Sequence, residues 1–113
     1  MVKDWNQFAS DSGATFANLG RANHELIKAV RSIESAGSKG ALDDKTKELI
    51  ALAVAATTRC DGCIAAHTGR AIKAGATRDE LVEALAMAIS LNTGAATVYS
   101  SHILEAYDQM TGK

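Results

Sequence analysis

Residues 48–67 read ELIALAVAATTRCDGCIAAH. Residues 49–56 of this stretch are all apolar, so a helix formed here has no polar face and must be covered on every side. Asp43 and Asp44 precede it and supply N-cap oxygens and negative charge where a helix start favours them. We therefore expect a helix that ends near Thr58 and serves both as the central helix of the domain and as part of a subunit interface.

Helical patterns precede this stretch. Trp5, Phe8 and Phe16 recur at near-helical spacing up to Gly20, which is expected to take the left-handed conformation of a helix C-cap. A second amphipathic helix is predicted over residues 23–35, followed by a glycine-rich loop. The three aromatic side chains are expected in the core or at a subunit contact and not in a substrate pocket.

Further helices are predicted after the cysteine pair. The first is closed by Gly75, and Thr77 with Glu80 matches a capping box that opens the next. That helix is expected to end at residues 92–94, Asn-Thr-Gly, and a last helix to cover residues 95–110. The last helix is expected to turn one set of side chains inward: Val98, Tyr99, Ile103 and Ala106.

Composition places the chain among small, all-α, soluble proteins. Its 113 residues suit a single domain (residues 1–113), with a helical arm at 1–37 and a motif-bearing core at 40–110. The expected fold is a compact bundle of five or six helices that oligomerises through apolar helices. Twelve basic against thirteen acidic residues leave no surplus to bind nucleic acid. No signal peptide is recognisable, and residues 49–56 are too short to span a bilayer, so we expect a cytoplasmic protein without a membrane partner.

The chemistry is concentrated in Cys60 and Cys63, at the start of a predicted helix, and in His67. Two thiols separated by two residues can close a disulfide across one helical turn, and a helix N-terminus favours the thiolate. His67 lies four residues after Cys63, on the same helix face, where it can act as its general base. If the two helices pack antiparallel, Glu48 returns towards His67 and fixes its tautomer.

Several alternatives stay open on these residues. Cys60, Cys63, His67 and Glu48 could ligate zinc, although one cysteine pair with a carboxylate is an uncommon structural site. The pair could also be inert, or the protein could be a lyase that does not use its thiols. The helix terminus favours Cys60 as the nucleophile, whereas the pairing with His67 favours Cys63. Asp61 is expected to set the turn and local charge without reacting.

At these positions the chain resembles the alkylhydroperoxidase D-like branch of the carboxymuconolactone decarboxylase family. The shared pattern is Glu48, eleven residues, Cys60, two residues, Cys63, three residues and His67, and the resemblance extends over residues 40–110. One departure is Gly62, because the mycobacterial type of alkylhydroperoxidase D has a histidine there.

The resemblance implies a thiol-dependent peroxidase, an antioxidant oxidoreductase of peroxiredoxin type. Cys63 would attack the hydroperoxide, Cys60 would resolve the sulfenic acid as a disulfide, and His67 with Glu48 would relay protons. An external dithiol or thiol would restore the pair, with no organic cofactor or metal. A homo-oligomer is implied, with a hexamer favoured over a trimer. The alternatives are a non-redox decarboxylase-like lyase and a thiol–disulfide reductase without a peroxidase role. His102 is expected in the core or an interface, and His24 on the surface.

Overall fold

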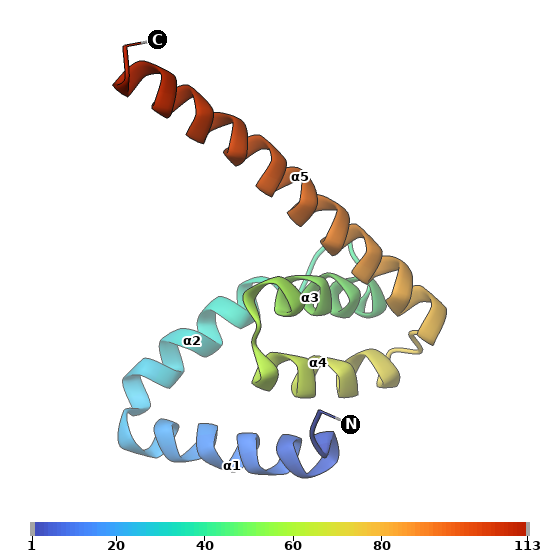
Figure 1. Cartoon of the computed structure of the whole chain (residues 1–113). Coiled ribbons are helices and arrows are strands. Elements are labelled where there is room, and N and C mark those ends of the chain that lie inside the picture. The colour runs from blue at the N-terminus through green and yellow to red at the C-terminus, as the bar shows by residue number, and fades with distance from the viewer. Residues whose placement is uncertain (1, 113) are drawn as a thin grey trace.

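Helices account for nearly all of the regular structure in this chain (Figure 1). The computed structural model describes residues 2–112, and within them the fold is all-α, as predicted, with no strand. The five helices in chain order are α1 (Trp5–Ala22), α2 (His24–Ala36), α3 (Asp44–Thr58), α4 (Asp61–Lys73) and α5 (Arg78–Met110).

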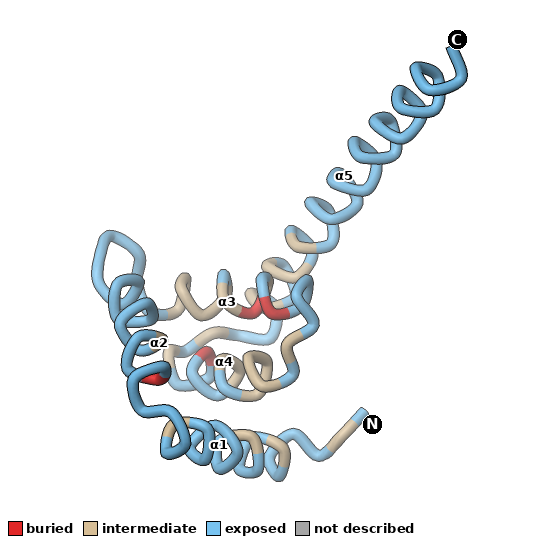
Figure 2. Tube along the Cα trace, turned by 90° about the vertical axis from the view of Figure 1, so that its left-hand side faces the viewer, coloured by how far each residue is buried: buried red, intermediate tan, exposed pale blue. Residues whose placement is uncertain are grey.

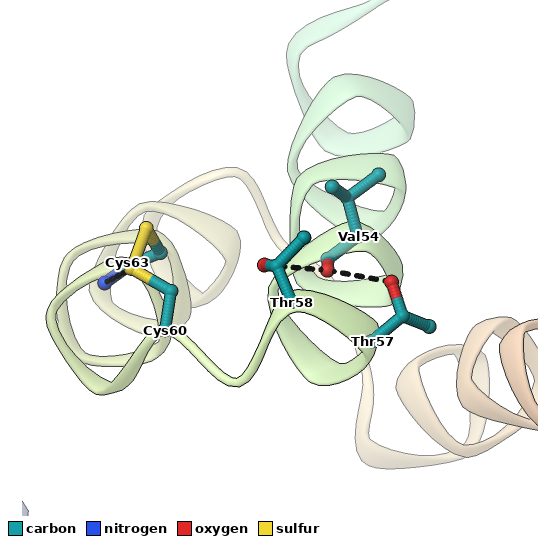
Figure 3. Close-up of a disulfide and its surroundings, with 5 residues drawn as sticks. All are labelled: Val54, Thr57, Thr58, Cys60 and Cys63. Carbon is teal, nitrogen blue, oxygen red and sulfur yellow. Dashed lines mark hydrogen bonds between the residues drawn. A yellow bond between two sulfur atoms is a disulfide. The ribbon is translucent and has the colours of Figure 1, made fainter.

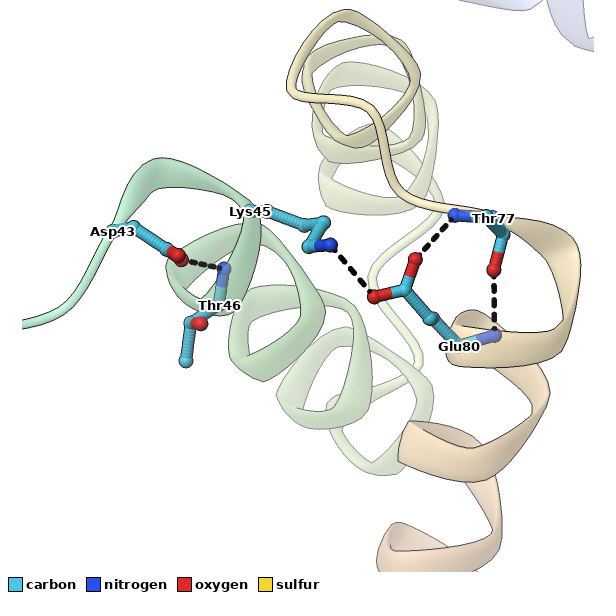
Figure 4. Close-up of polar contacts among 5 residues, drawn as sticks. All are labelled: Asp43, Lys45, Thr46, Thr77 and Glu80. Carbon is cyan, nitrogen blue, oxygen red and sulfur yellow. Dashed lines mark hydrogen bonds and ion pairs between the residues drawn. The ribbon is translucent and has the colours of Figure 1, made fainter.

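Every one of these helices begins with a side-chain cap. The side chains of Asp4, Asn23, Asp43, Cys60 and Thr77 each accept a hydrogen bond from a backbone amide three residues later, which satisfies an otherwise unpaired helix donor. Asp43 thus caps α3 as expected, and Thr77 forms the expected capping box, in which the Glu80 side chain accepts from the Thr77 amide (Figure 4). Each helix start is therefore specified by four consecutive residues.

Helix α3 lies at the centre of the fold. It packs against α4 and against the first part of α5, while α1 covers the other side of α4 and α2 packs on α1. Leu52 and Ala55 on α3 and Ala71 on α4 are buried. The central place predicted for α3 is confirmed, but Ile50 and Val54 are about half exposed, so one chain does not cover this helix on every side.

The expected end of the first helix at Gly20 is wrong. Helix α1 continues to Ala22, and Asn23 both terminates it and caps α2. The physical reason is the packing of Ile27, which is buried against this glycine: a Cβ atom at position 20 would lie 3.4 Å from its Cγ1. Gly20 therefore lies within van der Waals range of α2 and does not take a left-handed backbone.

The expected break at residues 92–94 is also wrong, because α5 is one continuous helix of 33 residues. The polar side chains here bond back to their own helix: Asn92 donates to the carbonyl of Ala88 at 2.7 Å, and Thr93 to that of Ile89 at 3.0 Å. Gly94 costs a helix interior only about 1 kcal/mol, and no proline interrupts the chain. An Asn-Thr-Gly sequence therefore does not end this helix.

The second half of α5 projects away from the other helices (Figure 1). Every residue from 89 to 112 is exposed (Figure 2), which corrects the expectation that Val98, Tyr99, Ile103 and Ala106 face inward. The Cα radius of gyration is 18.7 Å, against about 13 Å for a compact domain of this length, so the bundle is not compact. By length and composition alone, α5 is also long and apolar enough to cross a membrane, which the sequence analysis did not anticipate.

Candidate active site

The connection from α3 to α4 places the cysteine pair. Arg59 takes the left-handed conformation, with φ 55°, and reverses the chain direction directly after α3. Before it, the hydroxyls of Thr57 and Thr58 both donate to the carbonyl of Val54 (Figure 3), so the polar groups of the last turn are paired within the helix. The tight reversal brings Cys60 to the N-cap of α4 and makes α3 and α4 antiparallel neighbours.

Cys60 and Cys63 form a disulfide across the first turn of α4 (Figure 3). Their Cα atoms are 5.2 Å apart, within the range that a disulfide spans without backbone movement. The backbone amide of Cys63 donates to the Sγ atom of Cys60 at 3.2 Å. The sulfur of Cys60 therefore lies at the positive end of the helix dipole, where a thiolate would be stabilised.

Glu48 and His67 meet across the α3–α4 interface. The Oε2 atom of Glu48 lies 2.6 Å from the Nδ1 atom of His67, and only 16% of the glutamate side chain and 29% of the imidazole are exposed. A carboxylate can only accept here, so Nδ1 carries the hydrogen in this contact. In the neutral imidazole the lone pair is then on Nε2, which is free to accept a proton.

A cleft between α1, α2 and α4 opens onto the redox pair. Its volume is about 530 Å³, and Cys60, Cys63 and His67 all line it, whereas Glu48 does not. The rest of the lining is Ala9, Ser12, Gly13, Phe16, Arg31, Glu34, Gly62, Ala65, Ala66 and Arg70. A substrate in this cleft would reach both sulfurs and the imidazole, while the glutamate acts from behind the histidine.

Phe16 therefore has a different place from the one expected. It is close to half exposed and lines the cleft, so it is available to a ligand and not confined to the core.

Trp5 and Phe8 instead pack edge to face, with ring centroids 5.8 Å apart. The ammonium of Lys3 lies 4.3 Å from the Phe8 ring centroid and pairs with Asp61 at 2.5 Å, so the charge between the two cysteines is partly neutralised.

The metal alternative applies only to the reduced cysteine pair. Both sulfurs are committed to the disulfide, and an oxidised pair offers no thiolate ligand. Among residues 2–112, no three His, Cys, Asp or Glu side chains are grouped so that they could hold a metal ion.

A family model for the carboxymuconolactone decarboxylase family matches residues 14–106, which is most of the chain. The chain belongs to the carboxymuconolactone decarboxylase family. A crystal structure of an apo carboxymuconolactone decarboxylase family protein from Legionella pneumophila is 38% identical, covers 93% of this chain and 95% of its own, and superposes with a TM-score of 0.73. The helical architecture is therefore that of the family.

Curated relatives match over nearly the full length. An uncharacterised protein from Haemophilus influenzae is 48% identical over 108 residues, covering 95% of this chain and 96% of its own. An uncharacterised protein from Cupriavidus necator is 32% identical over 111 residues, covering 97% and 98%. These relatives support the family membership, and their names assign no substrate or reaction.

Some residues of this family member's cleft carried no signal in the sequence analysis. Ser12 and Arg31 come from α1 and α2, and their place depends on how these helices pack on each other and on α4. A Cβ atom at Gly62 would lie 3.2 Å from the hydroxyl oxygen of Ser12, so the glycine allows α1 to approach the redox turn closely. Arg70 could have been found, because it continues the helical spacing of Cys63 and His67.

The two remaining histidines lie outside this cleft. His24 is exposed, as expected. His102 is exposed on α5, with its ring 5.0 Å from that of Tyr99, so the expectation of a core position within one chain is wrong. Its expected role at an interface stays a prediction.

Proposed function

We propose that the protein is a thiol peroxidase of the alkylhydroperoxidase type, which reduces hydroperoxides with Cys60 and Cys63. The observation that carries the proposal is that one cleft is lined by a cysteine pair at disulfide distance and by an imidazole held by the part-buried carboxylate of Glu48. A thiol peroxidase needs these parts: a nucleophilic thiol, a second thiol that closes a disulfide, and a group that moves protons.

The proposed cycle starts from the reduced pair. The Cys63 thiolate attacks one oxygen of the O–O bond, an S–O bond forms, and the alkoxide leaves as an alcohol after it takes one proton. The product on Cys63 is a sulfenic acid. The Cys60 thiol then attacks this sulfur, the disulfide forms, and the hydroxyl leaves as water. The peroxide is thereby reduced by two electrons, and the two thiols are oxidised.

In this cycle His67 moves the protons. It takes the thiol proton of Cys63, one turn earlier on the same helix face, and returns it to the leaving alkoxide. Glu48 acts through the imidazole: its carboxylate accepts from Nδ1 at 2.6 Å, which holds the tautomer and stabilises the imidazolium. The part-buried contact keeps this partner in place while the substrate occupies the other side of the ring.

An external dithiol or thiol then reduces the disulfide by thiol–disulfide exchange. The sulfur that leaves in such an exchange is the one with the more stable thiolate. Because the Cys63 amide donates to Sγ of Cys60, Cys60 is the better leaving group, and the reductant attacks Cys63.

The same contact also favours a second candidate function, a thiol–disulfide reductase without peroxidase activity, since that enzyme needs only the exchange step.

The decisive experiment counts thiols by mass spectrometry on the reduced protein, before and after one equivalent of cumene hydroperoxide. We expect a loss of two thiols and of two mass units, with no oxygen retained. Cys63→Ser should abolish peroxide consumption, whereas Cys60→Ser should still form one sulfenic acid per chain. The reverse pattern would exchange the two roles. Thiols that react with a disulfide substrate and not with the peroxide would establish the reductase instead.

We further propose that the functional form is a homo-oligomer of a cytoplasmic protein, with six copies favoured over three. The support is the projecting half of α5, where Val98, Ile103, Leu104 and other large apolar side chains are more than half exposed. Among residues 2–112, four apolar residues are buried, which is a small core for a chain of this length, and a second copy packed on α5 would enlarge it. Light scattering should give a multiple of 11.8 kDa, and flotation with lipid vesicles should leave the protein unbound. A mass of 11.8 kDa would contradict the homo-oligomer, and flotation with the vesicles would contradict the cytoplasmic location.

A further inference from the structure

The face of α4 that lines the cleft ends in a cation. Cys63, His67 and Arg70 follow one another at positions i, i+4 and i+7, and all three line the same cleft. At 1.5 Å per residue, Arg70 lies about 10 Å further along the helix axis than Cys63. A ligand with one end at the sulfur can therefore reach this guanidinium with the other end.

A second guanidinium reaches the same cleft from a different helix. Arg31 belongs to α2 and lines the cleft opposite α4. Neither arginine takes part in the ion pairs of residues 2–112, which join Lys3 to Asp61, Lys45 to Glu80 and His67 to Glu48. Glu34 is the one acidic side chain of the lining, so two arginines against one glutamate leave the cleft with a positive balance.

The neighbouring groove between α1 and α2 adds to this positive balance. Its volume is about 860 Å³, and it shares Phe16 and Arg31 with the cleft. Arg21, Lys28 and His24 also line it, and no Asp or Glu does. Within this groove and the cleft the basic side chains therefore outnumber the acidic ones, whereas the chain as a whole has a net charge of −1. Such a local surplus attracts anions and raises their concentration at the site.

Apolar side chains also contribute to the lining of the cleft. Phe16, Ala65 and Ala66 line it, and the phenyl ring is exposed enough to contact a ligand. We propose that the cleft selects an organic hydroperoxide that carries a carboxylate on a compact apolar body. Arg31 and Arg70 would bind the carboxylate, Phe16 would contact the body, and the O–O bond would lie at Cys63. Guanidinium groups suit this task because they bind carboxylates through paired hydrogen bonds. The inference rests on the proposed peroxidase function.

The test compares two hydroperoxides that differ in charge alone: the carboxylate 4-(2-hydroperoxypropan-2-yl)benzoate and its primary amide. The reduced wild-type protein should consume the carboxylate with about a tenfold higher kcat/KM than the amide, which corresponds to ~1.4 kcal/mol of binding energy. Arg31→Gln and Arg70→Gln should each bring this ratio towards one. Arg78→Gln is the matched control, because Arg78 begins α5 and lines neither cavity, and it should keep the wild-type ratio.

Two further measurements separate this inference from the proposed function. Cumene hydroperoxide, which has no carboxylate, tests peroxidase activity alone. If the protein consumes cumene hydroperoxide but treats the carboxylate and the amide equally, the peroxidase stands and the anion site is refuted. Binding of the unreactive 4-isopropylbenzoate, followed by NMR shifts of the α4 amides, tests the site without turnover. Binding that weakens in both arginine variants supports the site, and no binding in the wild type overturns it.

Discussion

The contact between Glu48 and His67 leads to a quantitative prediction. Replacing Glu48 by Gln keeps the size of the side chain and an oxygen that accepts from Nδ1, but removes the negative charge. A hydrogen bond to a charged group contributes about 1.5–3 kcal/mol. Both side chains are less than one-third exposed at a distance of 2.6 Å, so solvent screens this interaction little. In Glu48→Gln, most of this stabilisation of the imidazolium by the carboxylate should therefore be lost.

Converted at 1.4 kcal/mol per factor of ten, this loss predicts a fall of about 10- to 150-fold in the rate constant of Cys63 oxidation by cumene hydroperoxide. Stopped-flow measurement on the reduced protein gives this rate constant directly. The matched control is Glu83→Gln, an exposed acid on α5 that should leave the rate constant unchanged. Thermal melting of both variants would show that the fold is retained.

One result would refute the relay. If Glu48→Gln changes the rate constant less than twofold while His67→Ala abolishes oxidation, then the imidazole works without its carboxylate partner. The contact at 2.6 Å would in that case only hold α3 against α4, and Glu48→Gln would lower the melting temperature without slowing the reaction.

Three further predictions concern stability. Leu52→Ala, at a site 5% exposed, should cost about 2–5 kcal/mol in urea unfolding. The hydrogen bond from Lys45, and after it the hydrogen bonds with Thr77, lower the pKa of Glu80. The ionised Glu80 therefore stabilises the folded protein above about pH 4.5, and this contribution is lost as the pH falls through the lowered pKa. Lys45→Met should therefore destabilise the protein at pH 7, and its difference from the wild type should shrink as the pH falls through the lowered pKa of Glu80. Gly62→Val should lower the melting temperature and loosen α1, because even a Cβ atom there lies 3.2 Å from the Ser12 hydroxyl oxygen.

Each of these has an outcome that would contradict it. Ile33→Ala, on a side chain 75% exposed, is the control for Leu52, and equal losses from the two would show that burial is not the cause. The Lys45 prediction fails if the difference in stability between the variant and the wild type stays the same throughout an acid titration from pH 7. If Gly62→Val melts at the wild-type temperature with α1 amides unchanged in hydrogen exchange, the close approach of α1 has no energetic importance.

Helix starts were predictable because each depends on a few neighbouring residues. The cap and its partner amide are three positions apart, so Asp43 with Thr46 and Thr77 with Glu80 could be recognised from the sequence. Helix ends were less predictable. Continuing a helix through a glycine or a polar residue costs little free energy, and whether the helix stops there depends on contacts with other parts of the chain. Helix α1 continues past Gly20 and ends before Asn23, which caps α2, and α5 continues through residues 92–94, whose Asn92 and Thr93 side chains bond back to the helix.

The sequence by itself determined the all-α class, the family pattern and the spacing that puts Cys60, Cys63 and His67 on one helix, since these depend on separations of a few residues. Only the tertiary structure decided which residues of other helices reach the site on that helix. Glu48 reaches His67 because the turn at Arg59 makes α3 and α4 antiparallel, and Arg31 reaches the cleft because α2 packs on α1. Such contacts depend on how one helix packs on another, which the spacing within a single helix does not encode; the contact between Glu48 and His67 was predicted only on the condition that the two helices pack antiparallel.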